Sequence, residues 1–149
     1  MNCDILSTLY VKSNGEILCN DDFGERVSLG SCRQSADDPD IHQTLNNDRY
    51  QHIREALKND QTPWPEVCEN CSFFRPDEPY SNDLHQSRII QKIQIEASLA
   101  CALKCPECSN LIQIKTRSGG RHFTPEMMAD LLGDLKEHHY QIRSIEYCG

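Results

Sequence analysis

The sequence predicts an α+β fold, in which a small cysteine-rich module made of a hairpin and a helix precedes a β-α-β unit. Three observations predict this fold. An Asn14-Gly15 pair between two apolar runs indicates a hairpin. Residues 47–58 carry apolar side chains at helical spacing. Residues 89–149 then predict a strand, a helix and a second strand. The 149 residues are enough for one ordinary domain or two small ones.

Composition excludes several classes of protein. The formal net charge is -8, which argues against a nucleic-acid partner or an anionic membrane surface. No apolar run approaches the ~18 residues of a membrane span. Asp4 stands where a secretory signal would be basic, so we expect no signal peptide. Nine cysteines, an odd number, exclude complete disulfide pairing and indicate metal or redox work in the cytoplasm.

The first hairpin is expected over residues 5–19, with the turn at Ser13-Asn14-Gly15. Cys3 precedes the first strand and Cys19 follows the second. Because the two strands run in opposite directions, their outer ends lie close together. The two thiols are therefore expected to share a site.

The next segment, residues 20–45, is rich in Asp, Gly and Ser and predicts a loop with one short element near Val27 to Gly30. A helix is expected over residues 47–58, capped by Asn47 or Asp48. Its apolar face is formed by Tyr50, Ile53, Ala56 and Leu57. The Pro-Trp-Pro run at 63–65 prevents the helix from continuing.

A C-x2-C pair, Cys68 and Cys71, follows the helix. Residues 76–88 contain turn-forming residues and predict a linker. The expected organisation is therefore a cysteine-rich module at 1–75, a linker at 76–88, and the β-α-β unit at 89–149.

The β-α-β unit begins with an apolar, alternating strand at residues 89–96. A helix is expected to start at Thr124-Pro125-Glu126, where Thr caps, Pro suits the first position and Glu favours the positive end of the dipole. Residues 142–147 predict the second strand, parallel to the first with a right-handed connection.

Three cysteines, Cys101, Cys105 and Cys108, lie between that first strand and the helix with the spacing C-x3-C-x2-C. A structural zinc site takes four ligands, so these three residues do not easily complete one. Iron–sulfur clusters are also held by cysteine thiolates, and three ligands leave one iron open to bind a cofactor.

This motif after a strand resembles the cluster motif of the radical SAM superfamily. The resemblance implies that Cys101, Cys105 and Cys108 hold a 4Fe–4S cluster. The unique iron would chelate S-adenosylmethionine, and electron transfer would produce a 5′-deoxyadenosyl radical. It implies a partial α/β barrel, an electron donor such as flavodoxin or ferredoxin, and a peptide or small-molecule substrate. A six-unit barrel needs on the order of 190 residues, so we expect residues 89–149 to be its start only, an N-terminal fragment that is inactive alone.

The N-terminal cysteines Cys3, Cys19, Cys68 and Cys71 resemble the ligand set of the SPASM or twitch modules of radical SAM enzymes. That resemblance implies an auxiliary 4Fe–4S cluster, so two clusters are expected in all. The module usually follows the barrel, and here it precedes it.

Two other functions stay open at this stage. Four cysteines with one C-x2-C pair also suit a structural zinc, and the protein would then be a zinc-binding interaction domain. Alternatively, a non-catalytic electron-transfer protein would take a fourth ligand for its second cluster from Cys32 or Cys148. Otherwise these two cysteines are expected to be bystanders, because free cysteine behaves as a small apolar residue.

Overall fold

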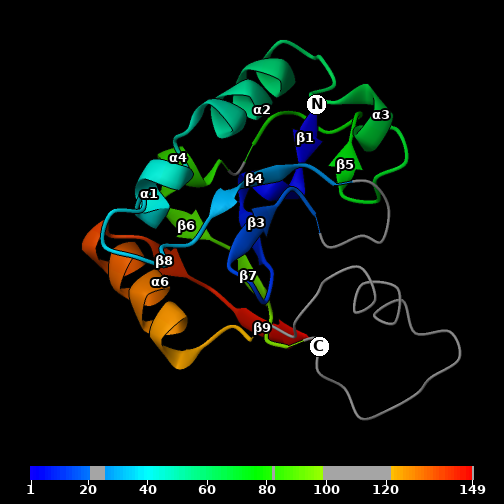
Figure 1. Ribbon diagram of the computed structural model, residues 1–149. Coiled ribbons are helices and arrows are strands. Elements are labelled where there is room, and N and C mark those ends of the chain that lie inside the picture. The colour runs from blue at the N-terminus through cyan, green and yellow to red at the C-terminus, as the bar shows by residue number, and fades with distance from the viewer. Residues whose placement is uncertain (21–25, 82, 99–121, 149) are drawn as a thin grey trace, which may run out of the picture.

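The computed structural model describes residues 1–20, 26–81, 83–98 and 122–148 (Figure 1). The fold is mixed α and β, as the sequence predicts. The strands are β1 (Asn2–Cys3), β2 (Thr8–Val11), β3 (Glu16–Leu18), β4 (Ser28–Ser31), β5 (Phe74–Arg75), β6 (Ile89–Ile90), β7 (Lys92–Glu96), β8 (Gln141–Ile142) and β9 (Ile145–Cys148). The helices are α1 (Ile41–Thr44), α2 (Asp48–Lys58), α3 (Pro65–Cys68), α4 (Leu84–Ser87) and α6 (Pro125–Glu137), with a 3-10 turn η1 (Asp4–Leu6).

A five-stranded sheet with the order β4-β3-β2-β7-β9 forms the centre of the fold. β2 and β3 are antiparallel and form the predicted hairpin. The turn between them needs Gly15, whose φ of +83° is rarely adopted by residues with a side chain. β4 adds to β3 and is the short element predicted near Val27 to Gly30.

The β-α-β prediction is confirmed in its order and in its parallel pairing. β7 and β9 are parallel neighbours, with Ile93 opposite Ile145, and α6 lies between them in the sequence. Each predicted strand is interrupted, however: β6 and β8 form a separate parallel pair just before β7 and β9. Thr124 caps α6 as predicted, since its side chain accepts a hydrogen bond from Met127 N–H.

The pairing of β2 with β7 is the contact that sequence patterns did not indicate. The two strands are parallel, with Leu9 opposite Ile93. They come from the two predicted modules, so strands from both modules share one sheet. Because β7 has β2 on one side and β9 on the other, both of its edges are paired, and Ile93 and Ile95 on one of its faces are fully buried.

The two longer helices, α2 and α6, lie beside the sheet (Figure 1) and contribute buried apolar residues to the same core. On α2 the buried residues include all four predicted ones, Tyr50, Ile53, Ala56 and Leu57. Asn47 caps this helix by accepting hydrogen bonds from Arg49 and Tyr50 N–H. On α6, Leu131 and Leu135 enter the same core. Among the helices of the described ranges, none has the length and apolar character needed to cross a membrane.

The segment predicted to be a linker, 76–88, packs into the molecule in its described part. It contains α4, and Leu84 is only 1% exposed. Asp83 is also buried; it caps α4 through His85 N–H and forms an ion pair of 3.3 Å with Arg54 of α2. A buried carboxylate needs such partners, because an unpaired buried charge is costly. The division of the chain into 1–75, 76–88 and 89–149 stays a prediction.

Candidate metal centre

Four cysteines from separate parts of the chain line one pocket of about 350 Å³. Cys3 ends β1, Cys19 follows β3, Cys68 ends α3, and Cys71 follows three residues later. These are the four thiols that the sequence predicts to share a site. The structure brings their side chains around one pocket; their binding of a metal stays a proposal.

Backbone hydrogen bonds position these cysteines. The pairing of β1 with β5 places Cys3 opposite Phe74, just beyond the C-x2-C pair. Within that pair, Cys71 N–H donates to the Cys68 carbonyl at 3.1 Å, which closes a tight turn. Pro65 occupies the first turn of α3, where a missing N–H costs nothing. Cys19 N–H donates to the Val27 carbonyl at 3.0 Å and so fixes the end of the hairpin.

Apolar side chains make up most of the remaining wall of the pocket, and they are Ile5, Ile53, Pro63, Trp64, Val67 and Phe74. Among its described lining residues, Asn20 is the polar one besides the cysteines. Such a wall keeps water away and gives the site a low effective dielectric, so charges and dipoles inside it act strongly.

Burial in this environment makes the thiols hard to ionise without a cation. The pKa of Cys3 is raised to about 12, and burial is the main cause. A hydrogen bond with the Ile5 backbone acts in the opposite direction, and the nearby Cys71, Cys68 and Cys19 contribute to the increase. Burial also raises the pKa of Cys19 and of Cys68. A bound metal reverses this balance, because a coordinating thiol is deprotonated outright.

Three hydrogen bonds are directed at the sulfur atoms. The Asn20 side-chain nitrogen Nδ2 lies 3.5 Å from Sγ of Cys19 and 3.5 Å from Sγ of Cys71. The two sulfurs are therefore no more than twice that distance apart. Val27 N–H donates to Sγ of Cys19 at 3.3 Å. Sulfur is a weak acceptor as a thiol, and hydrogen bonds to an ionised acceptor are stronger, so these donors favour the thiolate.

The chemistry of the donor set tells which groups the pocket suits. Four sulfurs without a carboxylate or imidazole favour zinc or an iron–sulfur cluster over magnesium or calcium. As the side chains stand, no group of three or more His, Cys, Asp or Glu residues within 1–20, 26–81, 83–98 and 122–148 could hold a single metal ion. The four sulfurs surround one pocket, and a set of four cysteines also suits a polynuclear centre such as a 4Fe–4S cluster.

The second predicted cysteine group, Cys101, Cys105 and Cys108, lies outside the described residues. The ends that flank it are described. β7 stops at Glu96, Ala97 N–H donates to the Cys148 carbonyl at 2.9 Å, and Ser98 forms a β-bridge with His122. The chain thus leaves from and returns to the carboxyl end of β7.

Neither Cys32 nor Cys148 lines the four-cysteine pocket. Cys32 is 2% exposed, and burial, followed by the charge of Asp134, raises its pKa to about 12. Cys148 is exposed at the end of β9, where its Sγ lies 3.5 Å from the Ile95 carbonyl. A bystander role agrees with both environments.

A buried ionic cluster at the carboxyl ends of β2 and β7 escaped the sequence analysis. Lys12 Nζ lies 2.6 Å from Glu96 Oε2, and the Ser13 hydroxyl donates to Glu96 Oε1 at 2.9 Å. Burial alone would raise the pKa of Glu96, but the hydrogen bond and charge of Lys12 outweigh it and lower the pKa. The sequence indicates this cluster only through a charged residue at the end of each strand, Lys12 and Glu96. The pairing of β2 with β7, which brings them together, has no local sequence pattern.

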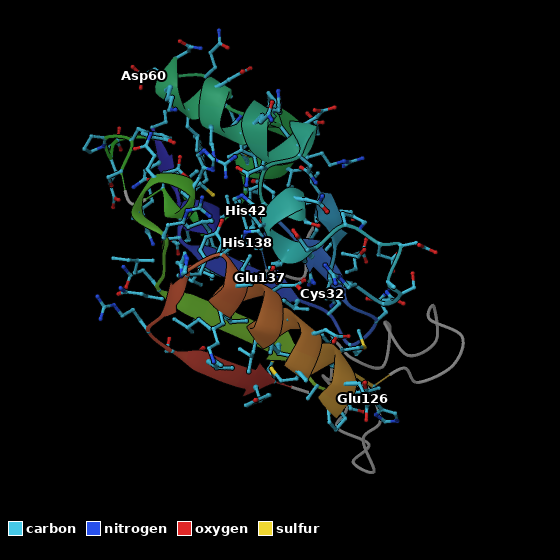
Figure 2. All side chains as sticks on the ribbon, turned by 90° about the vertical axis from the view of Figure 1, so that its left-hand side faces the viewer. Cys32, His42, Asp60, Glu126, Glu137 and His138 are labelled. Atoms are coloured by element: carbon cyan, nitrogen blue, oxygen red, sulfur yellow. The ribbon has the colours of Figure 1, made fainter. Side chains whose placement is uncertain are left out.

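A second polar cluster joins α1 to the end of α6. The rings of His42 and His138 stack with centroids 4.3 Å apart, as Figure 2 shows for their two labelled side chains. Nδ1 of His42 accepts from Arg88 Nη1 at 3.0 Å, and the Tyr140 hydroxyl lies 2.9 Å from the same atom. Burial and then the Arg88 charge lower the pKa of His42. This cluster is a packing contact between helices.

Comparison with known proteins finds no match: no family model, no curated protein and no solved structure is similar enough to this chain to count as one.

Proposed function

We propose that this chain belongs to a radical SAM enzyme that carries an auxiliary 4Fe–4S cluster. In this proposal Cys101, Cys105 and Cys108 hold the cluster that binds S-adenosylmethionine. Cys3, Cys19, Cys68 and Cys71 hold the auxiliary cluster. The observation that carries the proposal is the pocket lined by those last four cysteines.

The position of these four residues in the sequence makes the pocket informative. Cys71 comes 68 positions after Cys3, and the pairing of β1 with β5 brings the two ends of this stretch together. Burial raises the pKa of Cys3, Cys19 and Cys68, so these thiols stay protonated in the pocket without a cation. A cationic centre would favour their thiolate forms, and the three donors on the sulfurs would then stabilise the bound form.

The parallel strands support the second half of the proposal. β2, β7 and β9 end at the same edge of the sheet, and the segment with Cys101 begins five residues beyond Glu96. Parallel α/β sheets and barrels place their chemistry at the carboxyl ends of their strands. A cysteine-rich segment at this edge is therefore well placed to hold a reactive group.

The protein and its cofactors have different roles in this proposal. When bound, the cluster on Cys101, Cys105 and Cys108 and S-adenosylmethionine would supply the radical chemistry. The chain supplies the cysteine ligands, a largely apolar wall around Cys3 and Cys68, and the strand β7, after which Cys101, Cys105 and Cys108 follow in the sequence. We expect a peptide or small-molecule substrate and an electron donor such as flavodoxin or ferredoxin.

A zinc-binding interaction domain is the second candidate, and one observation favours it. Four cysteines with a C-x2-C pair are a complete tetrahedral ligand set for zinc. The zinc function needs only the pocket and gives Cys101, Cys105 and Cys108 no role. The two functions therefore differ in which cysteines bind metal and in which metal they bind.

The test is metal analysis of the protein purified without oxygen. The proposed function predicts iron and inorganic sulfide for two clusters per chain, with a brown chromophore. Cys105→Ala is expected to remove one cluster's worth of iron and Cys68→Ala the other. Cys148→Ala is the matched control, since this exposed thiol lies outside the pocket, and its iron content should equal that of the unchanged chain.

Three outcomes are decisive. Zinc in place of iron would refute the proposal and establish the second candidate. Loss of all iron from Cys105→Ala alone would refute two independent sites. A change in the electron paramagnetic resonance spectrum on addition of S-adenosylmethionine to the full-length enzyme, absent from its Cys105→Ala variant, would separate an enzyme from an electron carrier.

A further inference from the structure

The Asn20 side chain occupies an unusual position in the four-cysteine pocket. It is 2% exposed, and its Nδ2 lies at hydrogen-bond distance from two of the four sulfurs. A side-chain amide nitrogen carries two hydrogens, so one group can donate to Cys19 and Cys71 at once. Apart from the cysteines, the other described lining residues are apolar.

We propose that Asn20 sets the reduction potential of the cluster in this pocket by donating hydrogen bonds to the sulfurs of Cys19 and Cys71. The inference rests on the proposed function, because it requires a redox-active centre held by these cysteines. Asn20 is a positioning and tuning residue: it touches the ligand atoms, while Cys19 and Cys71 touch the metal.

The direction of the effect follows from charge. Reduction adds one negative charge to a cluster and its sulfurs, and donor dipoles aimed at the sulfurs stabilise that more negative state. The largely apolar wall strengthens the effect, because a low effective dielectric screens the dipoles less than water does. Asn20 therefore raises the potential. Val27 N–H acts in the same sense on Cys19.

The ligand set also indicates what kind of cluster Asn20 tunes. Four cysteine sulfurs provide one protein ligand for each iron of a 4Fe–4S cluster, so no iron is left open for a substrate. Tuning by hydrogen bonds matters for a centre that accepts and releases electrons. The four-cysteine site is therefore an electron relay, distinct in role from the three-cysteine site.

The experiment measures the potential of this cluster alone. The starting protein is the full chain with Cys105→Ala, which leaves the four-cysteine cluster in place. Asn20→Asp keeps the shape of the side chain and removes both donors, and Asn20→Ala removes them without adding charge. Asn46→Asp is the matched control, since Asn46 donates to the His42 carbonyl at 2.7 Å and does not line the pocket.

We expect both Asn20 variants to shift the potential to more negative values in an anaerobic dithionite titration followed by electron paramagnetic resonance. For Asn20→Asp, the ratio of reduced to oxidised cluster at a fixed ambient potential should fall at least tenfold, a shift of about 59 mV for one electron. Asn46→Asp should leave the potential unchanged.

Iron analysis of each sample distinguishes failure of the Asn20 inference from failure of the proposed function. Full iron with an unshifted potential in both Asn20 variants would overturn the inference and leave the proposed function intact. Zinc in the unsubstituted chain would overturn both. Should the variants lose their cluster, the Cys105→Ala chain labelled with 15N at the asparagine side-chain amides decides. A 15N hyperfine coupling to the reduced cluster supports the inference, and its absence overturns it.

Discussion

At the scale of single residues, the contacts of buried ionisable side chains determine their pKa values and their contribution to stability. His42 is an example. Its Nδ1 accepts from Arg88, which is always a donor, so the fold holds the imidazole neutral. Burial and the Arg88 charge accordingly lower the pKa of His42 in the folded state.

This lowered pKa predicts a pH dependence of stability. Between the ordinary value of 6.5 and the lower folded value, the unfolded chain binds more protons than the folded one. The His42 contribution to the free energy of unfolding is therefore present above 6.5 and is lost as the pH falls below it. His42→Gln should reduce this loss between about pH 7.5 and about pH 5 in urea titrations. His139→Gln, at an exposed position just beyond the end of α6, is the comparison, and an equal effect of both substitutions would contradict the account.

The ion pair between Lys12 and Glu96 gives a second prediction. The side chains are 7% and 11% exposed, so removing Lys12 takes a cation away from a largely buried carboxylate. Lys12→Met should lower the free energy of unfolding by about 3–5 kcal/mol. The double variant Lys12→Met with Glu96→Leu should recover much of that loss, because the buried carboxylate is gone as well.

An exposed ion pair between β7 and β9 is the control for this prediction. Lys92 Nζ lies 3.6 Å from Glu146, which is 57% exposed. Lys92→Met should cost no more than about 1 kcal/mol, since exposed pairs are screened by water. Equal losses from Lys12→Met and Lys92→Met in urea titrations would show that burial of the first pair is unimportant.

At the scale of elements, local signals in the sequence were reliable wherever the element is set by its own residues. The Asn14-Gly15 turn, the Asn47 cap of α2 and the Thr124-Pro125 start of α6 were all predicted and are confirmed. Each depends on a backbone conformation or a hydrogen bond formed within a few residues. The two interrupted strands were predicted as continuous, because the breaks at Gln91 and at 143–144 come from pairing partners, which have no local pattern.

Two glycines in different elements provide a matched test of packing. Gly30 in β4 has a φ of +140°, and a Cβ there would stand 2.7 Å from the Thr44 Cγ2 atom of α1. Gly30→Ala should destabilise the protein by about 1–3 kcal/mol through strain. Gly133 in α6 has no atom within 4 Å of such a Cβ, so Gly133→Ala should stabilise it by up to about 1 kcal/mol. Thermal denaturation of both variants measures the contrast, and a shift of both in one direction would contradict it.

At the scale of the whole molecule, the pocket joins parts of the chain that few other contacts hold. β1 and β5 form only a two-stranded pair, and α3 has no buried residue. The pocket residues Ile5, Cys19 and Ile53 belong to the core, whereas Cys3, Trp64, Val67 and Phe74 are only partly buried against it. We therefore expect a metal bound in the pocket to stabilise the region around α3 far more than the sheet.

Removal of the metal tests this expectation by hydrogen exchange. After chelation, amides in α3 and around Cys71 should lose protection, while those in β2 and β7 keep theirs, because the sheet is stabilised by its own buried residues. The variant Cys68→Ala should show the same pattern without a chelator. Uniform loss of protection across the sheet would instead mean that the metal supports the whole fold.

The sequence by itself determined the turns, the helix caps, the α2 face, and the two cysteine groups with their spacings. These features depend on residues that are neighbours along the chain, so their patterns are visible before folding. Only the tertiary structure decided that β2 lies beside β7, that Lys12 meets Glu96, and that Asn20 reaches two sulfurs. Contacts between distant segments depend on how the apolar faces pack together, and no short stretch of sequence encodes that packing.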